Sequence, residues 1–311
     1  MTDIRVLTVG ENEAGLRTDR FLAEKLPEFS RSYLQDLAAE GRIRILEKPV
    51  KSSRKLAAGE TVEIEIPDME VPEILPEKMD LDILYEDADV LVVNKPKGMT
   101  VHPAPGHSTG TLVNGIMDYC GSGLSGINGV LRPGIVHRID KDTTGSLVIC
   151  KNDAAHRSIA QQLQDHTVTR RYRGIVTGNL KDDSGTITGN IGRSTRDRKK
   201  MAVVREGGKR AVTHYRVLER FGNYTYCEFR LETGRTHQIR VHMASIGHPL
   251  LGDEVYGGSR KGFPEAEGQT LHAMVIGFRH PSDGRYIECT APLPAYFEEI
   301  LNRLRNERER R

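Results

Sequence analysis

Apolar positions near the N-terminus recur every three or four residues, which predicts two short helices. The first follows the run from Phe21 to Leu26, and the second follows the run from Tyr33 to Ala38. Ser30 or Ser32 can cap the second helix, and Gly41 is suited to end it. We therefore expect a helical pair at the start of the chain.

Alternating apolar and polar positions then predict strands. The stretches RIRIL (42–46) and ETVEIEI (60–66) are typical of two strands in a hairpin-like pair. Three prolines in PDMEVPEILP (67–76) interrupt the pattern and indicate a linker. The expected organisation is a first domain over 15–67, a linker over 68–80, a larger domain over 81–303 and a charged tail over 304–311.

The larger domain opens with one strand pattern and one helix pattern. Val90 to Val93 form an apolar run that leads into a Pro and Gly turn carrying Lys95 and Lys97. The stretch TGTLVNGIMDYC (109–120) is typical of a helix. The strand pattern thus places two basic side chains close to the end of an apolar strand.

The distribution of charge matters more than its sum in this chain. Lys and Arg number 45 against 43 Asp and Glu in 311 residues, so any nucleic-acid binding must come from clustered charge. Residues 31–55 hold seven basic side chains against three acidic ones, and residues 193–210 hold eight against two. Each cluster is a candidate phosphate-binding surface, and a solvated basic face is the alternative.

Cysteine spacing and hydropathy indicate the compartment. The four cysteines lie far apart without Cys-x-x-Cys spacing, which favours reduced thiols over a disulfide framework or a zinc site. The first twenty residues carry scattered charges and no apolar signal-peptide core, and no run of about eighteen apolar residues occurs. We expect a soluble cytoplasmic protein.

One short motif suggests a hydrolase. GHSTG (106–110) fits the nucleophile-elbow pattern, and Ser108, Asp140 and His237 follow each other in the chain order of a hydrolase triad. However, such an elbow follows a buried strand, and the two prolines of the preceding VHPAP cannot donate hydrogen bonds into a central strand. We therefore interpret Ser108 as a loop or helix-cap residue.

Two further motifs have structural interpretations. GSGLSG (121–126) resembles a phosphate-binding loop, but it follows a helical segment and leads into no helix, which favours a plain loop. His237 and His242 lie on an expected helix capped by Thr236, and their spacing of five does not suit two metal ligands. These histidines are interpreted as structural or RNA-contacting residues.

The stretch GIVHRIDKDTTGSLV (134–148) gathers ionisable side chains between apolar segments. If GIVHRID is the end of a strand that turns at KDTTG, Asp140 lies where the strand gives way to the turn. Asp140 or Asp142 can simply accept backbone hydrogen bonds in that turn. The alternative is a carboxylate paired with a fixed cation, which Arg235 or Arg240 can supply.

Longer stretches resemble one enzyme family. VVNKPKGMTVHP, HRIDKDTTGSLV, TRRYRGIV and LETGRTHQIRVHMASIGHPLLGDEVYGG occur in this order, and together they resemble the RluA-type pseudouridine synthases, most closely the RluD-like members. RTDRFLAEKLPEFSRSYLQDLAAEGRIRI resembles the S4-type RNA-binding module, although ILEKPVK replaces its usual Val-Asn-Gly turn. Ser146 also stands where the family commonly has Leu. The resemblance implies an α+β catalytic domain with a mixed, mostly antiparallel sheet, preceded by a small α/β RNA-binding domain.

The resemblance also implies a reaction and its residues. Asp140 matches the family's catalytic aspartate, Tyr172 matches the tyrosine that packs against the target base, and Arg240 matches the arginine paired with the aspartate. Arg138 matches a residue that fills the gap left by a flipped nucleotide. The implied reaction breaks the N1–C1′ bond of uridine, rotates the base and joins C5 to C1′. Asp140 can act as a nucleophile at C1′ or remove the 2′ proton, and the sequence leaves both open.

The implied partner is structured RNA. The resemblance indicates 23S ribosomal RNA, with tRNA as the alternative substrate and a non-catalytic RNA-binding protein as the rival function. We expect a monomer without membrane association, metal or organic cofactor. The expected RNA-contacting residues are Arg138, His137, Arg235, Lys95, Arg31, Arg42, Arg196, Arg198, Lys199 and Lys200.

Overall fold

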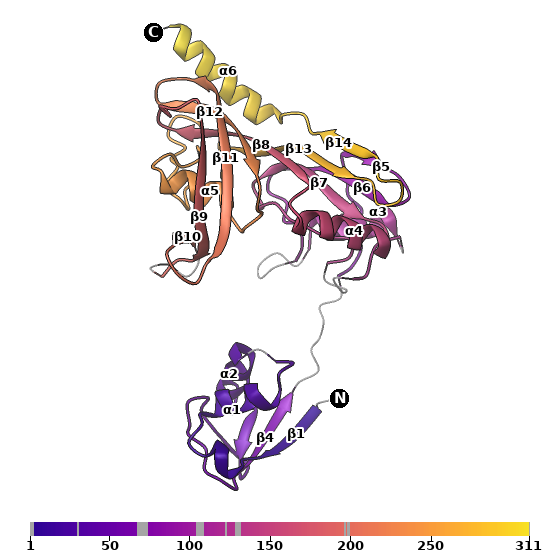
Figure 1. Cartoon of the computed structure of the whole chain (residues 1–311), viewed down its shortest axis with the longest axis vertical. Coiled ribbons are helices and arrows are strands. Elements are labelled where there is room, and N and C mark those ends of the chain that lie inside the picture. Colours follow the sequence, from indigo (N-terminus) through magenta and orange to yellow (C-terminus); the bar gives the residue numbers. More distant parts are fainter. Residues whose placement is uncertain are drawn as a thin grey trace. The chain divides into compact units, whose positions relative to one another are not determined.

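The chain, studied as a computed structural model, folds into two units, Met1–Val71 and Pro72–Arg311 (Figure 1). Each unit contains its own cluster of buried apolar side chains. The residues that the structure describes are 3–29, 31–66, 74–103, 109–121, 123–127, 132–195, 197 and 200–310.

The first unit is a four-stranded antiparallel sheet with two helices packed on one face. Its elements are β1 (Asp3–Thr8), η1 (Glu11–Glu13), α1 (Thr18–Lys25), α2 (Arg31–Ala39), β2 (Ile43–Ile45), β3 (Lys48–Pro49) and β4 (Thr61–Ile66). The strand order is β1-β4-β2-β3, so the edge strand β1 precedes the expected domain start at residue 15. Phe21 and Leu34 of the helices pack in one cluster with Ile43 and Ile64 of the sheet.

A tight turn without glycine joins β2 to β3. Leu46 and Glu47 have φ angles of 49° and 62°, the left-handed values that two-residue hairpin turns require. The sequence ILEKPVK therefore forms a tight turn although it lacks the usual Val-Asn-Gly. The side chain of Leu46 remains exposed at its tip.

The second unit is built on one large mixed sheet. Its elements are β5 (Ile83–Glu86), β6 (Val90–Lys95), α3 (Leu112–Cys120), β7 (Thr144–Cys150), α4 (Asp153–Gln164), β8 (Thr169–Thr177), β9 (Ser184–Arg193), β10 (Met201–Val204), β11 (Lys209–Arg220), β12 (Tyr224–Leu231), α5 (Gln238–Ser245), β13 (Leu271–Arg279), β14 (Tyr286–Thr290) and α6 (Ala295–Glu309). The order is β10-β9-β11-β12-β8-β13-β7-β6-β5, with β14 paired to β13. Among the described strands, only β13 and β7 pair in parallel. The α+β fold with a mostly antiparallel sheet is confirmed.

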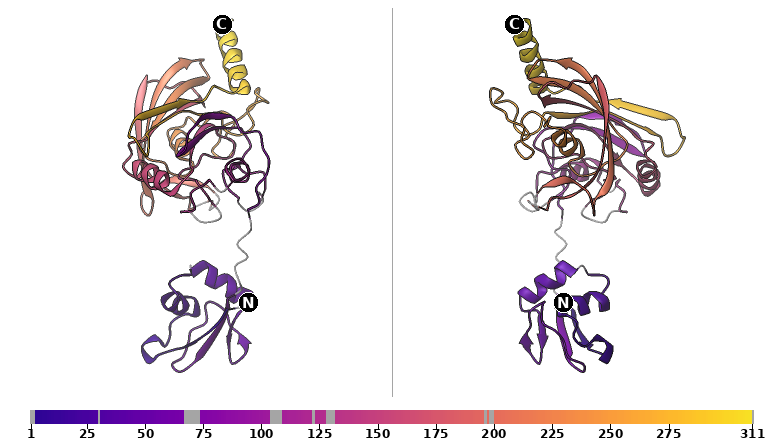
Figure 2. Two further views of the ribbon diagram at one scale, coloured as in Figure 1. Left: turned by 90° about the vertical axis from the view of Figure 1, so that its right-hand side faces the viewer. Right: turned by 60° about the vertical axis from the view of Figure 1, so that its left-hand side comes forward.

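Helices cover both faces of this sheet. Alternate residues of β6 and β7 enter different clusters, with Leu91 and Leu147 packing towards α3 and Val92 and Val148 packing towards α4. α5 lies on the same face as α3 and packs against β9, β10 and β11. α6, yellow in Figure 2, packs through Phe297 in a separate cluster with Ile175 of β8 and Tyr226 of β12. The site described below lies on the face of α3 and α5.

Two expected boundaries need correction. The linker predicted over 68–80 is shorter, because Ile74 is buried in the core of the second unit and Asn114 Nδ2 donates to the carbonyl of Leu75 at 2.8 Å. Residues 304–309 of the predicted charged tail are instead the end of α6, in which Leu304 is buried. Both segments carry apolar side chains that the larger core takes up.

Candidate active site

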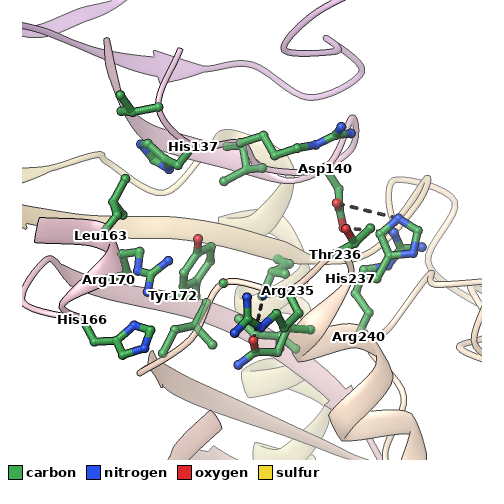
Figure 3. A pocket seen from close by; sticks show the side chains of 18 of the residues that line it. His137, Asp140, Leu163, His166, Arg170, Tyr172, Arg235, Thr236, His237 and Arg240 are labelled. Atoms are coloured by element: carbon green, nitrogen blue, oxygen red, sulfur yellow. Dashed lines mark hydrogen bonds and ion pairs between the residues drawn. The ribbon is translucent and has the colours of Figure 1, made fainter. Parts of the chain in front are cut away.

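A cavity of about 540 Å³ opens in the second unit, a size suited to a small organic ligand (Figure 3). Its walls come from residues 136–140, from β8, from residues 234–240 and from the C-terminal end of α4. Four arginines line it, and among the described lining residues Asp140 is the one carboxylate. The cavity therefore combines a cationic wall with a single acidic group.

Asp140 lies at the start of a turn. The strand predicted over GIVHRID is wrong: apart from one bridge between Ile135 and Ile149, the described residues 135–140 form no strand pairing. One reason is that the side chain of His137 takes a backbone partner, its Nε2 accepting from Val148 N–H at 3.1 Å. The turn that follows leaves the Asp140 side chain about one fifth exposed, at 18%.

Lys95 supports the same turn from inside the protein. Its buried Nζ donates to the carbonyl oxygens of Pro96, Met99 and Lys141 at 2.8, 2.8 and 2.9 Å. Burial lowers the pKa of Lys95 to about 7, although nearby carboxylates act in the opposite direction. The prediction that Lys95 contacts RNA is wrong, because its amine is occupied by backbone carbonyls.

Arg240, in the first turn of α5, holds Asp140 from the opposite wall. Its Nη1 donates to Asp140 Oδ2 at 3.1 Å. Its Nε and Nη2 donate to the two carboxylate oxygens of Asp253 at 2.7 and 2.9 Å. This bidentate contact fixes the guanidinium plane and directs one nitrogen at Asp140. Sequence reasoning missed Asp253, which lies in the stretch HPLLGDEVYGG (248–258).

The two carboxylates differ in access to the cavity. The side chain of Asp253 is 1% exposed and that of Arg240 is 7% exposed. Burial by itself lowers the pKa of Arg240, but the hydrogen bonds and charges of Asp253 and Asp140 raise it above its ordinary value. The guanidinium is therefore permanently charged. Asp253 holds this guanidinium on the side away from the cavity lining, and the partly exposed carboxylate of Asp140 faces the cavity.

His237 provides an unusual helix start. It is the N-cap of α5, with a left-handed φ of 57° and no side-chain capping bond, so the prediction of Thr236 as the cap is wrong. Its Nε2 lies 3.8 Å from Asp140 Oδ1, and its Nδ1 lies 2.8 Å from Tyr256 Oη. The left-handed backbone turns the ring towards the cavity, where Figure 3 shows it beside Asp140.

Tyr172 forms the apolar wall of the cavity. It lies on β8 and is 8% exposed. Burial raises the pKa of its hydroxyl, although the charge of Arg170 acts in the opposite direction, and the charge of Asp140 adds to the rise. Arg170, two residues earlier on the same face, is also buried and donates from Nη2 to the carbonyl of Glu232 at 3.2 Å. Figure 3 shows both side chains in the cavity. Sequence reasoning found Tyr172 but not Arg170.

Three of the residues predicted to contact RNA line the same cavity, but they differ in how their side chains are held. Arg138 is exposed, and its Nη1 lies 3.1 Å from Nε2 of the buried His102. The imidazole of His137 is held by the backbone, and burial, with the charge of Arg170, lowers its pKa to about 3. Arg235 donates from Nε to the carbonyl of Arg210 at 3.0 Å. Of the two candidate cations for Asp140, the structure pairs it with Arg240.

The other predicted contacts lie elsewhere. In the first unit, Arg31 donates to the buried carboxylate of Asp19, and Arg42 donates from Nη1 to Glu65 at 2.8 Å. In the second unit Lys200 precedes β10. Arg196, Arg198, Lys199 and the serine of the hydrolase motif, Ser108, lie outside the described residues.

Neither a metal cluster in the cavity nor a membrane span is found in the described part of the chain. Among the described residues, one group of three side chains could hold a metal ion, namely Asp87, Asp89 and His280. This group does not line the cavity. His242 points elsewhere, its Nδ1 lying 2.9 Å from Thr213 Oγ1. No helix among the described residues has the length and apolar character needed to cross a bilayer.

Comparison with known proteins identifies the family. The pattern described as RNA pseudouridylate synthase matches residues 89–245. The chain is 53% identical to the uncharacterised RNA pseudouridine synthase YlyB of Bacillus subtilis, over 96% of this chain and 97% of that protein. It is 45% identical to the ribosomal large subunit pseudouridine synthase D of Zymomonas mobilis, over 96% of each. The structure of human RNA pseudouridylate synthase domain containing 1 superposes with a TM-score of 0.56 at 26% identity, covering 76% of this chain and 98% of that one. The chain therefore belongs to the RNA pseudouridine synthase family.

Proposed function

We propose that this enzyme isomerises uridines of large-subunit ribosomal RNA to pseudouridine, with Asp140 as the group that acts on the ribose. The observation that carries the assignment is the pair of Asp140 and Arg240, in which the carboxylate faces a cavity and the cation is fixed from behind by Asp253. The non-catalytic alternative finds no support among relatives that are named pseudouridine synthases.

The reaction asks for one carboxylate and no added group. The bond between N1 and C1′ breaks, the uracil turns within the cavity, C5 bonds to C1′, the proton on C5 leaves, and N1 takes up a proton, so that the product is an isomer of the substrate. The carboxylate of Asp140 can stabilise or trap C1′, or remove the 2′ proton, and both routes need this group aimed at the sugar. Arg240 directs the carboxylate, because its fixed guanidinium donates from Nη1 to one carboxylate oxygen of Asp140.

The remaining walls suit a detached uracil. The ring of Tyr172 offers a flat apolar surface, and its raised pKa keeps the hydroxyl protonated at neutral pH. Arg170 and Arg235 contribute positive charge that favours an anionic RNA ligand. Arg138, exposed at the rim, is suited to occupy the space that a flipped nucleotide leaves.

The substrate assignment rests on two further features. Relatives at 45% identity are named ribosomal large subunit pseudouridine synthase D, which favours ribosomal RNA over tRNA. We further propose that the first unit is an S4-type RNA-binding domain, supported by the exposed Lys48, Lys51 and Lys55. β11 and the segment that joins it to β10 add a second basic surface, with Arg205, Lys209 and Arg210 exposed. Ribosomal RNA as substrate would place the enzyme in the cytoplasm.

Site-resolved mapping of pseudouridine tests this proposal. The purified protein is incubated with transcripts of large-subunit ribosomal RNA or of tRNA, and the Asp140→Asn variant serves as the comparison. We expect modification at defined ribosomal uridines by the parent and none by the variant, whose RNA affinity stays within about tenfold because the missing group contacts the sugar and not phosphates. Turnover by Asp140→Asn would show that Asp140 is not the group that acts on the ribose. Modification of tRNA alone would contradict the assignment of ribosomal RNA as the substrate.

A further inference from the structure

A compact turn over residues 250–258 places a second side chain besides Asp253, that of Tyr256, against Arg240. A Cβ atom at Gly252 or at Gly258 would overlap backbone carbonyl oxygens, so both positions require glycine. The backbone N–H groups of Tyr256 and Gly258 both donate to the carbonyl of Asp253, at 3.1 and 2.8 Å. This packing leaves the turn little freedom and fixes where Tyr256 points.

Tyr256 contacts three groups around the catalytic pair. Its Oη accepts from the backbone N–H of Met201 at 3.1 Å and lies 2.8 Å from His237 Nδ1. Its ring lies beneath the guanidinium of Arg240, with 5.1 Å between the ring centroid and the central carbon. The oxygen accepts from Met201 through one lone pair and can donate its single proton to Nδ1 of His237.

A hydroxyl that donates to Nδ1 sets the tautomer of His237. With Nδ1 accepting, Nε2 carries the proton, and Nε2 is the nitrogen that faces Asp140 Oδ1 at 3.8 Å. Burial lowers the pKa of His237, although Asp140 opposes this, so the ring is neutral at physiological pH. The positive end of the N–H dipole then points at the carboxylate that Arg240 also holds.

Tyr256 also connects the site to a basic part of the surface. Met201 is the first residue of β10, which belongs to the cationic stretch 193–210. Met201 and Tyr256 pack in one small cluster with Ile191 and Val241. Any shift of β10 therefore moves the donor that holds the hydroxyl of Tyr256.

We propose that Tyr256 is a positioning residue that links the seating of β10 to the catalytic pair, a role that rests on the proposed function. Its hydroxyl orients His237 so that Nε2–H faces Asp140, and its ring supports the guanidinium of Arg240. An RNA that seats β10 thereby stabilises the arrangement in which Asp140 is held from both sides. Tyr256 itself need not touch the substrate.

Kinetics of Tyr256→Phe test the proposal. Phenylalanine keeps the ring under Arg240 and removes the oxygen that joins Met201 to His237. We expect the single-turnover rate at saturating RNA to fall about tenfold, the effect of removing one hydrogen bond from the site, while the Kd for RNA changes less than about twofold. Tyr224→Phe, on β12 outside the cavity, is the matched control and should behave as the parent. Parent-like turnover by Tyr256→Phe, or a loss confined to Kd, would overturn the role.

A double-mutant cycle separates positioning from simple loss of stability. His237→Asn is chosen because asparagine tolerates the left-handed backbone at this position. If the hydroxyl acts through His237, adding Tyr256→Phe to His237→Asn should lower the single-turnover rate by less than about twofold. The same tenfold cost in both backgrounds would show that Tyr256 acts by another route.

A spectroscopic measurement keeps this inference independent of the proposed reaction. Nitrogen-15 NMR of the imidazole rings distinguishes the two neutral tautomers, and His237→Asn assigns the signals. We expect the Nε2–H tautomer in the parent and a mixture in Tyr256→Phe. The tautomer can be measured whether or not the parent modifies RNA. A parent that modified no RNA would overturn the proposed function but not the role of Tyr256 in setting the tautomer. A parent ring protonated on Nδ1 would overturn the role of Tyr256.

Discussion

Replacing Asp253 with asparagine removes the carboxylate that fixes Arg240 from behind. The side chain keeps its size, but Nε and Nη2 of Arg240 lose their charged acceptors and the guanidinium gains freedom to turn. The Nη1 atom of Arg240 is then no longer held in one orientation towards Asp140. We expect Asp253→Asn to lose both stability and turnover, although Asp253 lies outside the cavity lining.

The magnitude follows from the burial of the pair. Removing one partner of a buried ion pair usually destabilises a protein by about 3–5 kcal/mol, because the other charge is left uncompensated. Asp140 remains as a second carboxylate 3.1 Å from Arg240 Nη1, which places the expected loss near the lower end, at about 3 kcal/mol. For a unit of this size, that loss lowers the unfolding midpoint by roughly 6–12 °C.

The assay pairs thermal unfolding of the full chain with single-turnover kinetics at saturating RNA. The transition of the second unit is the one to follow, and Asp118→Asn, at an exposed position of α3, serves as the control. We expect the control to match the parent in both measurements. If Asp253→Asn unfolded within about 1 °C of the parent and kept its turnover rate, the bidentate contact would not be what directs Arg240.

Two further predictions concern pH and salt. Burial lowers the pKa values of His242 and His272 to about 4, whereas the unfolded chain takes up these protons near pH 6.5. Their contribution to stability is therefore complete above about pH 6.5 and is lost as the pH falls towards 4, and an unfolding midpoint that stayed constant from pH 7.5 to 4.5 would contradict this. Removing residues 1–71 should flatten the dependence of log affinity on log salt by about 0.7–0.9 for each RNA phosphate that the first unit neutralises, while single-turnover rates at saturating RNA change far less. An unchanged salt slope would mean that the first unit does not bind phosphates.

The spacing of apolar residues predicted several helices and strands correctly, because that spacing determines which face of each element is buried. The helices α1, α2 and α3 and the strand β6 appear where apolar spacing indicated them. The pairing of Asp140 with Arg240 was also expected, because the resemblance supplied a partner 100 residues away in sequence. Spacing alone left Arg235 as an equal candidate, and the structure decides between them since Arg235 turns to the carbonyl of Arg210.

The sequence could not show which distant groups the fold brings together. Residues 31–55 seemed strongly basic, yet Asp19, Glu60 and Glu65 from outside this window pair with Arg31, Arg54 and Arg42. Lys95 seemed an exposed turn lysine because no local signal reveals three carbonyls that converge on it. The strand predicted over GIVHRID failed because the side chain of His137 competes for a backbone donor.

The parallel contact between β7 and β13 bears on how the enzyme becomes active during folding. The two strands meet at Thr144 with His272 and at Gly145 with Ala273, and a Cβ at Gly145 would overlap the backbone of Ala273. This contact joins segments more than one hundred residues apart, so forming it requires closure of a long loop. Asp140 lies just before β7, and its partner Arg240 lies in the loop that the contact closes. Topologies of this kind fold slowly, and we expect refolding chains to recover catalytic competence after their helices and local hairpins have formed.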